Sequence, residues 1–501
     1  MVEQPADPSL KAFRLLVLVS TAARLVFAAT AGLKYEEAYY WNYGQHPALS
    51  YFDHPPMVAW LARLSTGVFG NAEIFVRLPA ILLFAASLVL VHRVARDLFD
   101  SRVALGAAVL MTLLPTFEFY SMMLFPDAPL LFFWSLGLWC GHRLVSEGDP
   151  RWWWGVGLTT GLGMLSKYPA ALIPLAPLLL LVLQRRWALL ARWEVLGAAL
   201  LALLLFSPVL AWNAQNDWAS LAYQGTSRMS EATSFRDRFG GSLLNQLLML
   251  SPGGLLAVAW AVAWALRRWR EPRFQYLLCA CVPFLGLMLL VSTRRLVQMN
   301  WPLPGYVAAI LLLAALWTEA EVWTRRRGLL ALVLVPAALL SALPWVATFA
   351  EIGALNRADD FSGWTRMGQQ ATQIRATMPQ PQQTFLAGHG YQAASVLAYY
   401  AGDPQNTLSN NILGEHAKGY DFWTPPERYL GWDAVYMVYE RPKSSGDWRP
   451  MVELDPPDRL KSHFSRVEGP QNLTVFRGGK PLRRYVFYRC FDYLGPRSVG
   501  P

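Results

Sequence analysis

The sequence predicts a polytopic α-helical membrane protein with a C-terminal soluble domain of mixed α/β class. Hydrophobic residues make up 54% of the 501 residues, more than an ordinary globular domain carries. Apolar runs of about 20 residues, the length that crosses a bilayer core, recur up to residue 349 and then stop. The chain also contains 22 Trp and 20 Tyr, whose amphipathic rings gather at membrane–water boundaries.

The apolar runs predict about eleven membrane spans, within a range of 9 to 13, because region 150–184 can be divided in more than one way. The predicted spans are 12–33, 74–92, 103–122, 127–145, 152–166, 168–184, 194–212, 243–266, 274–292, 302–318 and 328–349. Near the N-terminus of the chain, Lys11 and Arg14 precede an apolar stretch that contains Arg24 and lacks a convincing cleavage site of small residues. We therefore expect it to be retained rather than removed as a signal peptide.

Alternate loops between these spans are rich in arginine, as the positive-inside rule requires of loops that face the cytoplasm. They hold Arg93, Arg96 and Arg102; Arg143 and Arg151; Arg185, Arg186 and Arg192; Arg267, Arg268, Arg270 and Arg273; and Arg325, Arg326 and Arg327. With the N-terminus inside, an odd number of spans places residues 350–501 outside.

The last part of the chain changes character, since its apolar runs shorten and Pro, Gly, Asp and Asn become frequent. We therefore divide the chain into a transmembrane domain, 1–349, with a large first outer loop at about 34–73, and a soluble domain, 350–501. The soluble part is long enough for a core of its own. Its predicted strands are 384–387, 434–439 and 473–476, and its predicted helix is 392–400.

Charge and cysteine usage exclude several classes of protein. The net charge of +10 does not indicate nucleic-acid binding, because Lys and Arg cluster between apolar runs and form no basic stripe interleaved with aromatic residues. Three of the four cysteines lie in apolar runs, so there is no disulfide framework. No Asp, Glu and His cluster has firm ligand spacing, so we expect no obligatory metal or cofactor; the neighbouring Asp53 and His54 leave a divalent ion open.

The predicted outer loops collect polar residues that the topology brings to one face. They are Glu36, Glu37, Asp53 and His54 in the first loop, Asp127 in the second, Lys167 in the third, residues 213–238 in the fourth, and Arg294, Arg295 and Asn300 in the fifth. Ionisable residues at the edge of an apolar helix are costly and are candidates for function.

The first outer loop reads YEEAYYWNYGQHPALSYFDHPP. The adjacent Glu36 and Glu37 can supply a general base and a substrate-binding acid. Rings such as Tyr40 can offer a platform on which a sugar stacks. The alternative is an acidic helix start with interfacial aromatic residues. The loop by itself does not decide between them.

The other outer residues also allow two interpretations. Lys167 in LSKYPA either extends to the lipid headgroups or binds an anion. Asp127 in FPDAP is either a helix N-cap or a functional carboxylate. Arg294 and Arg295 lie outside, against the positive-inside bias, so a phosphate partner explains them better than topology does.

Six motifs carry a family resemblance: YEEAYYW, YFDHPPM, FPDAPLLFFW, GLGMLSKYPA, WNAQNDW and NWPLPGY, in this order within residues 12–310. Together they resemble bacterial GT-C glycosyltransferases of the dolichyl-phosphate-mannose-protein mannosyltransferase superfamily. The nearest resemblance is to enzymes that add galacturonic acid or 4-amino-4-deoxy-L-arabinose to lipopolysaccharide core or lipid A. It implies a bacterial inner-membrane protein with its N-terminus in the cytoplasm, and with its active site and C-terminal domain in the periplasm.

The resemblance implies an inverting transfer of a sugar from polyprenyl phosphate to an acceptor on the outer face: lipid A, lipopolysaccharide core, another glycolipid or a protein. Glu36 fills the position of the family's catalytic Asp but is one methylene longer, so either Glu36 is the base or Glu37 takes a larger share. The expected ligands of the donor phosphate are His54, Lys167, Arg294 and Arg295, and the residues expected to position substrate are Asp53, Asp127, Tyr40 and Asn300.

The chemistry of such a transfer follows from charge. Cations aimed at the departing lipid phosphate stabilise its growing negative charge, and a carboxylate deprotonates an acceptor hydroxyl. If the acceptor is itself a phosphate, the carboxylate instead positions the sugar. The alternative function is a transporter or flippase of lipid-linked sugars, whose usual internal repeats are not visible in the sequence. A non-catalytic scaffold or a polysaccharide polymerase is a further alternative.

Overall fold

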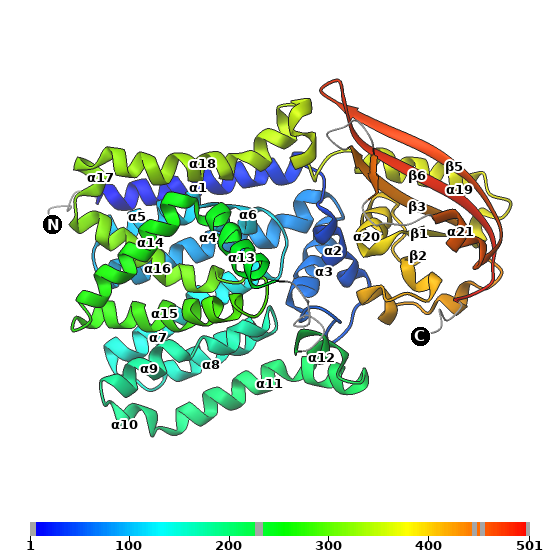
Figure 1. Cartoon of the computed structure of the whole chain (residues 1–501). Coiled ribbons are helices and arrows are strands. Elements are labelled where there is room, and N and C mark those ends of the chain that lie inside the picture. The colour runs from blue at the N-terminus through cyan, green and yellow to red at the C-terminus, as the bar shows by residue number, and fades with distance from the viewer. Residues whose placement is uncertain (1–6, 226–233, 443–447, 451–455, 497–501) are drawn as a thin grey trace. The chain divides into compact units, whose positions relative to one another are not determined.

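The computed structural model describes residues 7–225, 234–442, 448–450 and 456–496, and the chain divides into two compact units (Figure 1). The helical unit comprises Met1–Val26, His54–Val58 and Arg77–Ala342. The sheet unit comprises Phe27–Asp53, Ala59–Val76 and Leu343–Pro501. Most of the first outer loop therefore belongs to the same unit as the C-terminal residues. The domain boundary after residue 349 stays a prediction.

The first part of the chain folds almost entirely into helices (Figure 1). They are α1 (Pro8–Thr30), α4 (Glu73–Leu98), α5 (Ser101–Leu113), α6 (Pro115–Met122), α7 (Asp127–Glu147), α8 (Trp152–Met164), η1 (Tyr168–Leu172), α9 (Leu175–Leu183), α10 (Trp187–Leu190), α11 (Trp193–Gln215), α12 (Ala219–Gly225), α13 (Phe235–Leu250), α14 (Pro252–Arg267), α15 (Pro272–Ser292), α16 (Leu303–Glu319), α17 (Val322–Arg325) and α18 (Arg327–Phe349).

Helix α16 is the centre of the helical unit. Its residues from Leu303 to Trp317 are all buried, and it packs against α5, α14 and α15. A helix that is apolar around its whole circumference is stable where other helices surround it. Elsewhere small residues allow close packing: a Cβ at Gly157 of α8 would lie 2.5 Å from the carbonyl oxygen of Ala198 in α11.

The chain is a multi-pass membrane protein. Among the described residues, five helices are long and apolar enough to cross a membrane, namely α1, α4, α11, α15 and α18, and the number is up to seven if two bent helix pairs each count as one span. Each predicted span coincides with a helix or with a pair of helices. Because α8 and α9 have only 13 and 9 residues, the count of about eleven stays a prediction.

Two of the predicted spans contain a break. Within 103–122, α5 and α6 meet at an angle of 67°, and within 243–266, α13 and α14 meet at 94°. In each pair the second helix begins with a proline, Pro115 or Pro252. Proline has no N–H to donate and restricts the residue before it, so the preceding helix ends there.

The sheet unit is of mixed α/β class, as predicted. Its elements are α2 (Tyr35–Gln45), α3 (Met57–Phe69), η3 (Gly353–Ala358), α19 (Trp364–Ala376), η4 (Pro381–Gln383), β1 (Thr384–Gly388), α20 (Gly390–Ala401), β2 (Thr407–Leu408), η5 (Asn410–Leu413), η6 (Lys418–Phe422), η7 (Pro426–Tyr429), β3 (Asp433–Pro442), β4 (Trp448–Pro450), α21 (Pro456–Lys461), β5 (Phe464–Arg477) and β6 (Lys480–Tyr493). The strand order is β2-β1-β3-β6-β5, with β4 paired to β3; β1 runs parallel to β2 and β3, and β3, β6 and β5 are antiparallel.

The predicted strands lie within β1, β3 and β5, and the predicted helix lies within α20. The long strand β6, which pairs with both β3 and β5 (Figure 1), was not predicted. Its sequence contains three arginines, which obscure the apolar pattern of an internal strand. One of them, Arg483, is buried with its guanidinium 3.9 Å from the centre of the Trp364 ring.

Candidate functional site

The two glutamates of the first loop have different surroundings at the start of α2. Glu37 is fully buried, and its carboxylate accepts the backbone N–H of the N-cap residue Lys34 at 3.0 Å. This is the reciprocal half of a capping box. The Glu36 side chain retains 22% exposure and lies 3.4 Å from the Lys34 ammonium. Glu37 therefore holds the helix start, and Glu36 is the carboxylate that a substrate can approach.

Burial raises the pKa of Glu36 above its ordinary value, and the Lys34 ammonium partly offsets this effect. The Oε2 atom of Glu36 is buried and accepts no hydrogen bond from the described residues. A carboxylate in these surroundings is a stronger proton acceptor than an exposed one. The local chemistry suits the general-base role predicted for Glu36.

Asp53 lies at the other end of the same loop segment and is 6% exposed. Its Oδ1 accepts hydrogen bonds from the hydroxyls of Tyr39, at 3.1 Å, and Tyr43. Its Oδ2 lies 3.8 Å from the Lys418 ammonium of η6. The following residue, Gly419, donates its N–H to the Tyr39 hydroxyl at 3.0 Å, which holds η6 against α2. Burial and the Asp53 charge raise the pKa values of both tyrosines, so they stay neutral donors.

Tyr40, predicted to position substrate, is 7% exposed, and its ring meets that of Tyr43 edge-on at 5.7 Å. The aromatic residues of α2 thus pack within the sheet unit, where Tyr39 also contacts Tyr391 and Trp423. The role of Tyr40 stays a prediction.

Three predicted residues meet in the helical unit: Asp127, Lys167 and Asn300. The Lys167 ammonium lies 2.9 Å from Asp127 Oδ1, and the Asn300 amide donates to Asp127 Oδ2 at 2.8 Å. The Asp127 and Lys167 side chains are only 2% and 10% exposed. Asp127 lies in the first turn of α7 after an N-cap at Pro126, and no side chain caps this helix. Asp127 is therefore the centre of a buried polar cluster rather than an N-cap.

The two neighbouring arginines differ in their surroundings. Arg294 is exposed, whereas Arg295 is 6% exposed and its guanidinium lies 4.5 Å from the centre of the Trp301 ring. His54 is half-buried. The predicted phosphate ligands thus include one buried guanidinium and one exposed one, and their roles stay predictions. Within the described residues, no three His, Cys, Asp or Glu side chains gather as metal ligands.

Sequence reasoning missed the partners that the sheet unit brings to α2. Tyr39 and Tyr43 have a signal, because a spacing of four residues places both on one face of a helix. Lys418, which pairs with Asp53, and Asp360, which pairs with Lys34 just before α2, have none, since they are far from the first loop in sequence. The buried pair of Arg24 and Glu118, with Arg24 also donating to Ser121 at 2.6 Å, was missed too.

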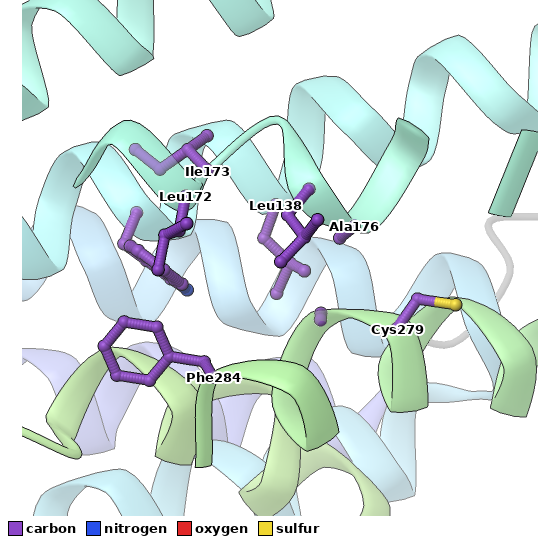
Figure 2. Close-up of a pocket in the computed structure, with 9 residues that line it drawn as sticks. Leu138, Leu172, Ile173, Ala176, Cys279 and Phe284 are labelled. Carbon is purple, nitrogen blue, oxygen red and sulfur yellow. The ribbon is translucent and has the colours of Figure 1, made fainter. Parts of the chain in front are cut away.

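The helical unit contains one void and one groove of interest. The void between α7, η1, α9 and α15 (Figure 2) has a volume of about 10 Å³ and is lined by side chains such as Leu138, Ile173 and Phe284, so it is a packing gap. The groove has a volume of about 580 Å³ and is lined almost entirely by apolar residues of α13, α14, α15 and the start of α16. Its size and lining suit an apolar ligand.

Comparison with known proteins agrees with this architecture. The profile of a family described as dolichyl-phosphate-mannose-protein mannosyltransferase matches residues 53–212. The crystal structure of ArnT from Cupriavidus metallidurans bound to undecaprenyl phosphate is similar over 96% of this chain and 98% of its own, with a TM-score of 0.63 and 16% identity. The archaeal oligosaccharyltransferase AglB from Archaeoglobus fulgidus, in complex with an inhibitory peptide and a dolichol-phosphate, is similar over 89% and 75%, with a TM-score of 0.51 and 13% identity. The chain therefore shares the fold of these two proteins.

Two curated relatives are similar to this chain in sequence. The lipid A galacturonosyltransferase RgtD of Rhizobium johnstonii is 28% identical over 58% of this chain and 61% of its own length. The undecaprenyl phosphate-alpha-4-amino-4-deoxy-L-arabinose arabinosyl transferase of Pseudomonas aeruginosa is 30% identical over 56% of this chain and 52% of its own. The matched regions thus cover between half and two thirds of these relatives.

Proposed function

We propose that the protein is an inverting glycosyltransferase of the bacterial inner membrane. It moves a sugar from a polyprenyl-phosphate donor to an acceptor on the outer face of the membrane, and lipid A or lipopolysaccharide core is the acceptor class that its relatives favour. The fold shared with a transferase that binds undecaprenyl phosphate supports a polyprenyl-phosphate donor. The active site and the C-terminal residues then face the periplasm.

The observation that carries the proposal is the apolar groove and the loop at its edge. Leu243, Val262 and Leu289 of three different helices line the groove, and Leu243 and Leu289 are exposed. Val297 also lines the groove, and two hydrogen bonds fix its backbone to α13. Arg295, two residues earlier, is therefore anchored near an apolar channel. A lipid phosphate requires this combination of an apolar surface and a cation.

In the proposed mechanism, the groove, the cations and the carboxylates have separate roles. The isoprenoid tail lies in the groove, and the phosphate is held by Arg295 with His54, Lys167 and Arg294 as further ligands. As the bond from sugar to phosphate breaks, these cations stabilise the leaving phosphate. Glu36 accepts the proton of an acceptor hydroxyl, and Asp53, Tyr40, Asp127 and Asn300 position the substrates.

A flippase of lipid-linked sugars is not favoured, because the similar proteins are transferases by name and the GT-C fold is shared along nearly the whole chain. The direct test uses the purified protein in liposomes with radiolabelled polyprenyl-phosphate sugars and with lipid A or lipopolysaccharide core. Transfer of label to the acceptor is the expected result. Translocation of donor without transfer would favour the flippase instead.

The groove offers a sharper test with a matched control. A Cβ at Gly286, a helical residue that lines the groove, meets no atom within 4 Å, so Gly286→Trp fills the groove without a clash at its base. Gly328 is also helical, exposed and open at Cβ but lies outside the groove, so Gly328→Trp is the control. We expect Gly286→Trp to raise the donor KM about tenfold or more and Gly328→Trp to leave it unchanged. Equal behaviour of the two variants would remove the groove from the proposal.

A further inference from the structure

Four charges of alternating sign form a chain at the start of α2. The Lys34 ammonium lies 3.4 Å from Glu36 and 3.6 Å from Asp360, which lies between η3 and α19. Asp360 in turn pairs with Arg441 of β3 at 2.5 Å. The four side chains are between 14% and 25% exposed, so each is largely removed from water. Charges in such surroundings interact more strongly than at the surface.

The backbone around this chain of charges is fixed by close contacts. A Cβ at Gly32 would lie 2.3 Å from the carbonyl oxygen of Phe361, so only glycine permits this approach of the two segments. The N–H of Leu33 donates to the Tyr400 hydroxyl of α20 at 2.7 Å. The segment before α2 is thus held directly against residues of the C-terminal part of the chain, which keeps the Lys34 backbone beside the segment that carries Asp360.

We propose that Lys34 and Asp360 are positioning residues for Glu36, and that the C-terminal part of the chain thereby sets the proton affinity of the catalytic carboxylate. This inference rests on the proposed function, in which Glu36 is the base. Lys34 is shared between two carboxylates, so the charge of Asp360 limits how strongly Lys34 stabilises ionised Glu36. Arg441 also pairs with Asp360, and its positive charge reduces the effect of the Asp360 charge on Lys34 and Glu36.

The signs follow from the charges. Burial raises the pKa of Glu36, the Lys34 charge lowers it, and the Asp360 charge raises it. Burial opposes ionisation of Asp360, but Lys34 and the neighbouring arginines together hold its pKa below the ordinary value. Other titratable or charged groups facing this cluster in the sheet unit are Tyr35, Tyr391, Tyr439 and Arg483.

The inference predicts opposite effects from two neutralising substitutions. In a plot of kcat against pH, activity falls at low pH as Glu36 becomes protonated, and this fall is the acid limb. Lys34→Met should move the acid limb to higher pH, because ionised Glu36 loses its cation. Asp360→Asn should move it to lower pH, because Glu36 loses a negative neighbour. Arg441→Gln leaves the charge of Asp360 unbalanced and should move the limb to higher pH, which gives a second variant if Asp360→Asn does not fold. Lys34→Arg keeps the positive charge and should therefore leave the pH profile of kcat as in the wild type.

The state of Glu36 can also be read without transfer. A carbodiimide modifies protonated carboxyl groups, so mass spectrometry of the labelled full-length protein across pH titrates Glu36 itself. Lys461→Met and Asp458→Asn provide the control, since this exposed pair in α21 has the same side-chain types. Neither control should move the Glu36 titration.

Each pattern of results has one meaning. Opposite shifts in labelling and in kcat support both proposals. Opposite shifts in labelling in a protein that transfers no sugar support the role of Lys34 and Asp360 and refute the proposed function. The positioning role is refuted if the protein transfers sugar but neither Lys34→Met nor Asp360→Asn changes the pH profile of kcat or of Glu36 labelling. It is also refuted if both substitutions shift these profiles in the same direction.

Discussion

The buried cluster of Asp127, Lys167 and Asn300 permits a prediction that separates stability from catalysis. Asp127→Asn preserves the size of the side chain and can still accept the Asn300 hydrogen bond, but it removes the charge 2.9 Å from the Lys167 ammonium. Loss of one partner from a buried ion pair costs about 3–5 kcal/mol. Because the substituted amide keeps one polar contact, we expect the lower end, about 3 kcal/mol.

The measurement is unfolding of the detergent-solubilised protein. The double variant with Asp127→Leu and Lys167→Met replaces both charges by apolar groups, and such replacements are often neutral in stability. It should therefore recover most of the stability that Asp127→Asn loses. The control is Glu147→Gln, which breaks an exposed pair with Arg143 on the same helix and should cost well under about 1 kcal/mol. A loss as small as that of Glu147→Gln would refute the buried pairing.

The same double variant tests the predicted phosphate contact of Lys167. A charge-assisted hydrogen bond to phosphate contributes about 1.5–3 kcal/mol, or roughly ten- to hundredfold in kcat/KM for the donor. If Lys167 binds phosphate, the double variant should be stable but should lose activity by at least this factor, since it also removes Asp127, which is proposed to position substrate. Wild-type kcat/KM in the stable double variant would leave Lys167 with a structural role alone.

Three other predictions concern single residues. Glu36→Gln should lower kcat by about 10² to 10⁴ with little change in donor KM, whereas Glu37→Gln should leave kcat nearly unchanged and cost well under about 1 kcal/mol of stability, because a glutamine there can still accept the Lys34 N–H that caps α2. Arg295→Met should lower kcat/KM for the donor about ten- to hundredfold, and Arg294→Met, at an exposed arginine, should change it less. A cysteine in place of the exposed Ser462 should react with an impermeant maleimide in right-side-out vesicles, where the buried native cysteines give little background.

These outcomes can fail independently. An active Glu36→Gln variant beside an inactive Glu37→Gln variant would exchange the two roles. A larger loss at Arg294 than at Arg295 would move the phosphate site to the exposed guanidinium. Labelling of the Ser462→Cys variant only after permeabilisation would invert the predicted orientation.

Much of the helical unit was predictable because membrane spans follow from chain-local hydropathy. The predicted runs coincide with helices, and the two internal breaks occur where the second helix begins at Pro115 and Pro252. Two elements were not predicted correctly, because their local sequence does not show that they are buried. Helix α2 has Ala38 as its one aliphatic residue, yet most of it is buried, because its tyrosines and Trp41 pack on the C-terminal residues. In strand β6, arginines interrupt the apolar pattern, and one of them, Arg483, packs over the buried Trp364 ring.

The sequence by itself determined the class of protein, the order of its helices and the loops that carry ionisable residues, since composition and local hydropathy encode these properties. It also singled out Glu36, Asp127 and Lys167. Only the tertiary structure decided that Asp127, Lys167 and Asn300 form one cluster, that Glu37 caps a helix while Glu36 faces a cation, and that Asp360 competes for that cation. Pairings between residues so far apart in the chain depend on how whole elements pack, and no local rule of spacing or charge records that packing.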